Sequence, residues 1–320
     1  MTMFPDAHYV VLHIGPGRTV LQDVSLTAIG DAGRFDLTPD IWVERLDADL
    51  AKLIIRACDP PHHGINAIEH DYHLYAWVRR VPSYESKSFE GLQPMLGAIA
   101  LSRLIQPTST GLRYCAYISD LSPDARVVRA IPFKGISHDV ILGPGTRDWL
   151  TEADGTEVQK LMVWLGRDMH ERVRRAYWNH EYALRLYELD MRWPLIVGGF
   201  EALINTGRKE VTWQFTDRVS RLAAQFGISL TEDDLDKAYN LRSRLVHGER
   251  FLHALDASVP VIDQPVLYQK LETLLRLTVR ECLMDGSFHD HFKDGPTVEA
   301  CWPLRPKPNA KSRCKPKGKP

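Results

Sequence analysis

The chain has 320 residues, 44% hydrophobic and 25% charged, which is enough length and apolar content for a sizeable packed core. It has no run of about 18 uncharged apolar residues and no basic start followed by a long apolar segment, so we expect neither a membrane-spanning helix nor a secretory signal. The five cysteines are odd in number, widely spaced and form no CxxC pair, which favours reduced thiols in a cytoplasmic protein.

The first 150 residues mix strand-like and helix-like patterns. Short segments rich in β-branched and aromatic residues predict strands, and longer segments with apolar residues at helical spacing predict helices. The strand segments are 8–14, 73–81, 113–118 and 126–131, and the helical segments are 41–58 and 91–105. A Gly-Pro-Gly turn at 143–145 is a candidate domain edge. We therefore expect a mixed α/β domain over 1–150. It shows no catalytic signature, so by exclusion we assign it a sensing or regulatory role.

One stretch of this domain collects metal-ligating residue types. They are Cys58, His62, His63, His70 and His73. Zinc uses such ligands, but the spacing matches no standard structural zinc site. A histidine-rich loop that leads into a strand is the simpler interpretation, and we predict no metal and no cofactor.

From about residue 152 the sequence becomes almost entirely helical. Amphipathic patterns predict helices over 157–189, 193–205, 210–227, 231–248 and 265–286. Pro194 suits the first turn of the second helix. Thr231 and Asp234 have the form of a capping box that begins the fourth helix, and Gly248 should end it. Short connections between long helices predict an all-α bundle over 151–290, so the expected fold class is α+β.

The last segment, 291–320, is rich in proline and lysine, and we expect it to be disordered. Residues 304–320 hold seven lysines and arginines and no acid. Removing these seven charges from the net charge of −1 leaves −8 for the rest of the chain. The basic tail could hold RNA through its phosphates, or it could be a solubilising end.

Two charged residues occupy positions where apolar residues are expected. In the fourth helix, Leu235, Ala238 and Tyr239 define an apolar stripe, and Arg242 falls on the same face. In the second helix, Glu201 is the single charged residue between positions 193 and 206. Because a buried charge is costly unless it is paired, we expect Glu201 and Arg242 to pair. The pair could be structural and set the helix register, or it could serve a function.

His247 lies five residues after Arg242, which places it about 140° around the helix. The two side chains therefore diverge on one straight helix. They can converge if the helix opens near Gly248, or if a second copy of the helix faces the first across a twofold axis. A lone histidine at a helix end also serves commonly as a partner of the helix dipole.

The order of three segments resembles HEPN domains of the bacterial Apea-like group. The segments are FEALIN, a helix that starts EVTWQF, and YNLRSRLVHG. These domains are helical bundles marked by an R-x4–6-H motif, which Arg242 and His247 match with four residues between them. Ser243 matches a polar residue that often follows the arginine, and Glu201 matches an acidic residue on an earlier helix. The similarity covers roughly 155–285.

The resemblance implies a metal-independent endoribonuclease that works as a homodimer and has RNA as its substrate. His247 would move protons, Arg242 would stabilise the phosphorane, Glu201 would orient Arg242, and Ser243 would donate a hydrogen bond to phosphate. The expected products are a 2′,3′-cyclic phosphate and a 5′-OH. Family members occur in toxin–antitoxin and phage-defence systems, which implies a trigger or an antitoxin as partner. The alternative is a non-catalytic HEPN module for dimerisation and RNA binding.

Further RNA contacts are expected from Arg244, Asn240 and Arg175. Arg175 belongs to a stretch in which arginines alternate with aromatic residues, among them Trp178 and Tyr182. Such residues could stack on bases, although a solvated helix face beside a core stripe is the plainer interpretation.

Overall fold

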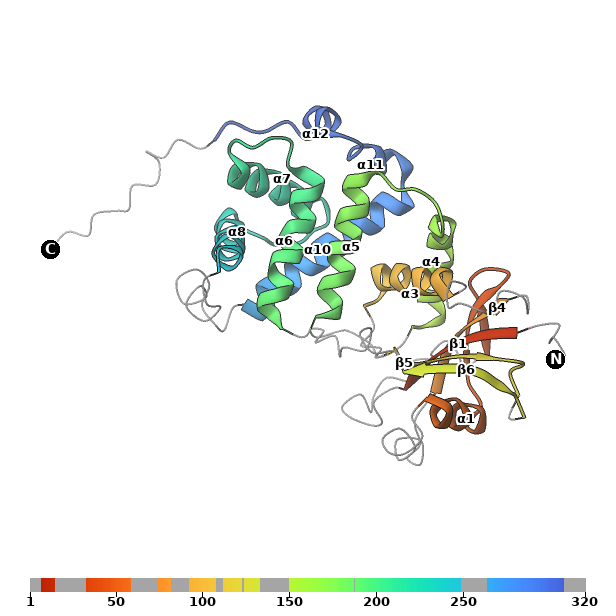
Figure 1. Ribbon diagram of the computed structural model, residues 1–320. Coiled ribbons are helices and arrows are strands. Elements are labelled where there is room, and N and C mark those ends of the chain that lie inside the picture. The colour runs from red at the N-terminus through yellow and green to blue at the C-terminus, as the bar shows by residue number, and fades with distance from the viewer. Residues whose placement is uncertain are drawn as a thin grey trace.

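The computed structural model describes residues 7–14, 33–58, 74–81, 92–107, 112–122, 124–132, 150–186, 188–248 and 264–307. In these residues an antiparallel sheet lies beside a helical bundle, and helix α3 lies between the two (Figure 1). No helix within these ranges combines the length and the apolar character needed to cross a membrane.

The sheet has six strands in the order β2-β3-β4-β1-β5-β6, and all neighbouring strands are antiparallel. The strands are β1 (Ala7–Ile14), β2 (Arg34–Asp36), β3 (Ile41–Arg45), β4 (Leu74–Val81), β5 (Leu112–Ile118) and β6 (Val127–Pro132). Central strand β1 sets Val10 opposite both Val78 of β4 and Ala116 of β5. The four strands predicted from the sequence are confirmed.

The helix predicted over 41–58 is wrong in its first part. Residues 41–45 form strand β3, and helix α1 runs from Ala48 to Cys58. The aromatic and β-branched side chains of β3 suit a pleated surface, and pairing with β2 and β4 completes their backbone hydrogen bonds. The side chain of Asp47 then accepts the backbone N–H of Asp49 at 2.9 Å and of Leu50 at 3.1 Å, which begins α1.

Alternate residues of the sheet belong to two different cores, because successive side chains of a strand point to opposite faces. Trp42 and Val78 are buried with Leu50 of α1 on one side. Tyr9 and Trp77 belong to the core on the other side, which also contains the buried residues of α3 (Gln93–Ile105). The predicted helix over 91–105 is therefore confirmed, and it covers one face of the sheet.

The bundle contains α4 (Glu152–Leu161), α5 (Glu171–Arg185), α6 (Leu189–Ile204), α7 (Val211–Gln225), α8 (Glu232–Val246), α10 (Gln264–Met284), α11 (Gly286–Asp290) and α12 (Gly295–Cys301). The sequence-predicted caps of α8 are confirmed: Thr231 Oγ1 accepts the N–H of Asp234 at 3.1 Å, and Gly248 has a φ of 82°. Helix α6 begins before its predicted start, so Pro194 lies inside the helix instead of in its first turn.

The single helix predicted over 157–189 is wrong, because the chain turns between α4 and α5. A short 3₁₀ turn at Met162–Trp164 ends α4, and Gly166 adopts a left-handed φ of 74° that favours glycine. The indole Nε1–H of Trp164 donates to the carbonyl of Leu283 at 2.7 Å, which anchors this turn to α10. An amphipathic pattern alone does not reveal such a break.

Helix α3 joins the sheet to the bundle. Its buried residues share one hydrophobic core with the sheet and with α5, α6 and α10. Arg103 of α3 forms a buried ion pair with Glu181 of α5, and Arg276 of α10 donates to the carbonyl of Ile105 at 3.3 Å. Residue 150 therefore separates two kinds of secondary structure but not two separate cores.

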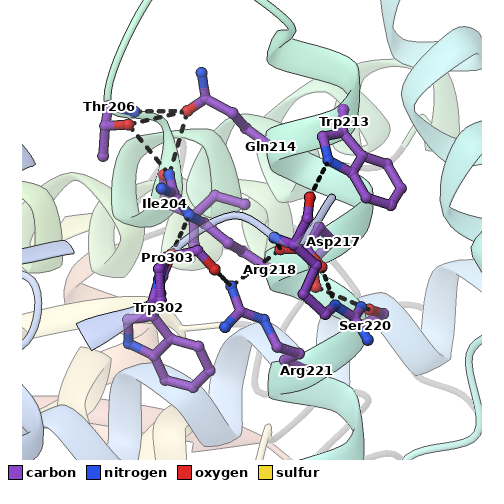
Figure 2. Close-up of polar contacts among 11 residues, drawn as sticks. Ile204, Thr206, Trp213, Gln214, Asp217, Arg218, Ser220, Arg221, Trp302 and Pro303 are labelled. Atoms are coloured by element: carbon purple, nitrogen blue, oxygen red, sulfur yellow. Dashed lines mark hydrogen bonds and ion pairs between the residues drawn. The ribbon is translucent and has the colours of Figure 1, made fainter. Parts of the chain in front are cut away.

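The C-terminal tail predicted to be disordered is ordered in its first part, so that expectation is wrong there. After α12 the chain crosses α7, where Arg218 donates to the carbonyl of Trp302 at 2.8 Å and Arg221 to that of Pro303 at 2.9 Å (Figure 2). Side chains of α7 thus satisfy the backbone of this extended segment, a contact that the basic composition does not reveal. Residues 308–320 lie outside the described part of the chain.

Candidate active site

Glu201 of α6 and Arg242 of α8 form the ion pair that the sequence pattern predicts. The distance from Arg242 Nη2 to Glu201 Oε2 is 2.7 Å. Their side chains are 28% exposed for Arg242 and 17% exposed for Glu201, so the pair lies at the edge of the bundle and not in its core. Both charges can therefore be reached from solvent, unlike those of a fully buried pair.

Tyr239 completes this cluster, and the sequence analysis did not assign it to the site. Its hydroxyl donates to Glu201 Oε1 at 3.1 Å, while Oε2 of the same carboxylate holds Arg242. Burial, followed by the negative charge of Glu201, raises the pKa of Tyr239 above its ordinary value, so the phenol stays a neutral donor. The sequence feature that could have assigned Tyr239 to the site is its position one helical turn before Arg242, on the same face of α8.

The guanidinium of Arg242 keeps donor capacity. Within the described ranges its Nη2 donates to Glu201, whereas its Nε–H is buried and has no hydrogen-bond partner. Buried donors without partners are uncommon in folded proteins. A guanidinium that is held in place by a carboxylate and is 28% exposed is suited to bind an anionic oxygen.

His247 does not meet Arg242 within one chain. The backbone N–H of His247 donates to the carbonyl of Ser243 at 3.1 Å, so α8 stays wound up to this residue and opens only at Gly248. The offset of about 140° around the helix therefore holds. The His247 side chain is exposed, and no hydrogen bond or ion pair among the described residues joins it to Arg242. The helix therefore opens only after His247, and this opening does not bring the two side chains together.

The other sequence-predicted site residues are divided between two helices. Ser243 and Arg244 are half-buried on α8, and Asn240 is exposed on the same helix. Arg175 lies on α5 in an ion pair with Glu171 at 2.6 Å. Helix α6 lies between α5 and α8 (Figure 1), so Arg175 is not brought to the Glu201–Arg242 pair.

Of the residues considered for zinc, Cys58 is the last residue of α1, and the four histidines fall in residues 59–73, outside the described part of the chain. Within that part, one group of metal-ligating residues comes together: His170, His289 and Asp290, with ligand atoms within 4.8 Å of one another. Hydrogen bonds already use these atoms, from His170 Nε2 to Asp290 at 2.9 Å and from the His170 backbone to His289 Nε2 at 3.3 Å. The group lies at α11 and the start of α5, not on α6 or α8.

Comparisons with known proteins give no match. Neither a scan against protein-family models nor searches of curated proteins and of solved structures find a protein similar to this chain. The HEPN resemblance therefore stands on the residues quoted for it, and the geometry around Glu201 is what the structure adds.

Proposed function

We propose that this protein is a metal-independent endoribonuclease of the HEPN type that acts as a homodimer. The observation that carries the proposal is the Glu201 carboxylate, held by Tyr239 on one oxygen and by Arg242 on the other. This arrangement fixes a permanently charged guanidinium at a half-buried site before any substrate arrives. A preorganised cation of this kind stabilises negative charge that develops on a phosphorane.

The reaction needs few groups from the protein. The 2′-OH of one ribose loses its proton and attacks the adjacent phosphorus, the bond from phosphorus to the 5′ oxygen breaks, and that oxygen gains a proton. A histidine can take and return protons near neutral pH, which is the role proposed for His247. Arg242 faces the phosphate oxygens, Glu201 positions Arg242, and Ser243 donates to phosphate. The products are a 2′,3′-cyclic phosphate and a 5′-OH.

A second copy of the chain would supply the missing proximity between Arg242 and His247. Gly198, one helical turn before Glu201 on α6, faces open space, because a Cβ atom added there would meet no atom within 4 Å. Two large apolar side chains are also exposed, with Met191 at 58% on α6 and Val246 at 55% on α8. In the proposed dimer, the second copy covers these two side chains.

The dimer has a direct test in Gly198→Gln. We expect this variant to fold like the wild type, because its side chain enters open space, and to become monomeric and lose cleavage together. Mass photometry and an RNA cleavage assay measure the two effects. A variant that is monomeric and still cleaves at the wild-type rate would contradict the shared site.

The nuclease activity is tested with an end-labelled single-stranded RNA in excess EDTA. The wild type should release fragments that end in a 2′,3′-cyclic phosphate, and His247→Ala should not. His170→Ala provides a matched histidine control outside α8. Persistent cleavage by His247→Ala at the wild-type rate would remove His247 from the mechanism.

The alternative function is a non-catalytic module for dimerisation and RNA binding. One observation favours it: within a single chain, His247 does not contact Arg242. RNA binding by wild type and His247→Ala without cleavage by either, even with cell extract added as a source of trigger, would support this alternative and end the nuclease proposal.

The proposed biological role is that of a toxin or a phage-defence nuclease in the cytoplasm, restrained until a trigger acts or an antitoxin is lost. The contact between α3 and the bundle supports a regulatory role for the sheet, because α3 shares a core with both. Expression in a bacterial host should slow growth with the wild type and not with His247→Ala. Equal growth of the two strains, with or without phage infection, would contradict this role.

A further inference from the structure

The exposed side of α5 carries two stacked aromatic side chains that the proposed active site does not use. Trp178 is 36% exposed and Tyr182 is 51% exposed. Their ring centroids are 5.7 Å apart, with 29° between the ring planes. Single exposed aromatic residues are ordinary on protein surfaces, whereas two rings in contact form a continuous flat surface on which a base can stack.

The pair rests on a rigid support. Trp178 contacts the ring of Tyr177 at a centroid distance of 5.0 Å, and Tyr177 itself is 4% exposed in the core. Burial raises the pKa of Tyr177 far above its ordinary value, so it remains an uncharged core residue. Helix α5 packs on both α6 and α10. The two outer rings are therefore held in place before any ligand binds, which lowers the entropy cost of binding.

Positive charge exceeds negative charge before the pair along α5. Glu171 accepts ion pairs from both Arg174 and Arg175, each at 2.6 Å. Two guanidinium groups thus share one carboxylate, and one positive charge is left over. Both arginines are well exposed, with 55% of the Arg174 side chain and 68% of the Arg175 side chain open to solvent.

An excess of positive charge also occurs at the other end of the aromatic pair. Glu181 is buried and pairs with Arg103 as well as with Arg185, which it contacts at 2.8 Å. Arg103 is itself buried, so Arg185 is the member of this group that solvent reaches. The guanidinium carbon of Arg185 lies 5.7 Å from the Tyr182 ring centroid, beside the aromatic pair.

We propose that Arg175, Trp178, Tyr182 and Arg185 form a platform that binds single-stranded RNA, here called the α5 platform. Bases stack on the outer ring faces and phosphates bind the arginines at either end. The proposal rests on the nuclease function, for which it names the substrate-binding surface. We take RNA as the occupant because the exposed rings can stack on flat bases and the excess positive charge at both ends matches a polyanion.

The test uses the full-length protein and a fluorescent 2′-O-methyl RNA of about 15 nucleotides, which has no free 2′-OH and cannot be cleaved. The double variant Trp178→Ala/Tyr182→Ala should bind about 5-fold to 100-fold more weakly, the range expected for loss of base stacking on aromatic side chains. Trp178→Phe/Tyr182→Phe keeps flat rings and should bind within about 3-fold of the wild type. Val163→Ala, which trims another side chain that is 52% exposed, is the matched control.

A second measurement tests the charges. Arg175→Gln should reduce the slope of log Kd against log salt by about one, because one phosphate contact is lost. Helix content should stay at the wild-type value in every variant, and the urea midpoint should stay there for Arg175→Gln, whose side chain is 68% exposed.

The outcomes separate the platform from the nuclease. Weaker binding by the alanine double variant supports the platform whether or not the wild type cleaves RNA. Unchanged binding overturns the platform and leaves the nuclease proposal standing if cleavage is observed. Unchanged binding together with a change in oligomeric state overturns it also, and assigns the aromatic pair to a protein interface. A wild type that neither binds nor cleaves RNA overturns both proposals.

Discussion

Two glutamates of neighbouring helices hold arginines in opposite ways. Glu181 of α5 meets Arg103 of α3 where the sheet layer joins the bundle, and the two side chains are 1% and 2% exposed. Glu201 of α6 meets Arg242 of α8 at the bundle edge, where the side chains are 17% and 28% exposed. The chemistry is the same, but a ligand can approach only the second pair.

The difference separates a structural charge pair from a candidate catalytic one. A buried pair rarely stabilises more than apolar residues of similar volume would, but removal of one partner leaves an uncompensated charge in the core. A pair that is partly open to solvent is screened and contributes less to stability than a buried pair. We therefore expect the Arg103–Glu181 contact to matter for folding and the Glu201–Arg242 contact to matter for the reaction.

The largest effect on stability is expected for Glu181→Ala, which leaves the Arg103 charge buried without its carboxylate. The free energy of unfolding should fall by about 3–5 kcal/mol, measured by urea denaturation. Glu171→Ala, on the exposed side of the same helix, is the control and should change stability by about 0.5 kcal/mol or less. A loss below about 1 kcal/mol for Glu181→Ala would show that the core tolerates this charge.

Arg242→Ala should show the reverse behaviour. Stability should change by about 1 kcal/mol or less, because the pair is partly exposed. RNA cleavage should fall by a factor of about 100–1000, the usual cost of losing a group that stabilises an oxyanion. Arg242→Lys keeps the charge but not the planar fork and should recover little activity. Full activity in Arg242→Ala would leave the pair a purely structural role.

Tyr239→Phe tests whether positioning of Glu201 matters. The variant loses one hydrogen bond to a charged group, so we expect a destabilisation of about 1–2 kcal/mol in urea. Cleavage should drop in kcat with little change in KM, because Tyr239 acts through Glu201 and Arg242 and does not touch RNA. An unchanged kcat in Tyr239→Phe would exclude Tyr239 from the site.

The smallest effect concerns His289, in a cluster remote from α8. Burial, followed by the neighbouring His170, lowers the pKa of His289, and the carboxylate of Asp290 opposes this shift. The unfolded chain therefore binds more protons than the folded chain as pH falls below the ordinary histidine range. Stability should fall from pH 7 to pH 5, and His289→Gln should flatten that dependence. An equally steep dependence in His289→Gln would assign it to other groups.

Local chemistry made several features of this protein predictable. Thr231 and Asp234 cap α8 as expected, and Gly248 ends it, because a cap is set by residues within one helical turn. The contact between Glu201 and Arg242 was also predictable, since each is an isolated charge on an apolar helix face and a charge in such a position needs a partner.

Contacts between distant segments decided the rest. Residues 41–45 continue a helical pattern in the sequence, but pairing with β2 and β4 makes them a strand. The turn after α4 is anchored by Trp164, which donates to a carbonyl 119 residues later in the chain. The hydroxyl of Tyr239 is drawn into the site by Glu201, 38 residues earlier in the chain.

The sequence by itself determined four of the strands, the helices α6, α7, α8 and α10, the caps of α8 and the two charges that must meet. Only the tertiary structure decided that Arg103 is buried in the core while Arg242 is partly exposed at the bundle edge. It also decided that Trp178 and Tyr182 lie on the surface while Tyr177 is buried. The physical reason is range: propensities and caps act within a few residues, whereas exposure depends on which distant helices pack around each side chain.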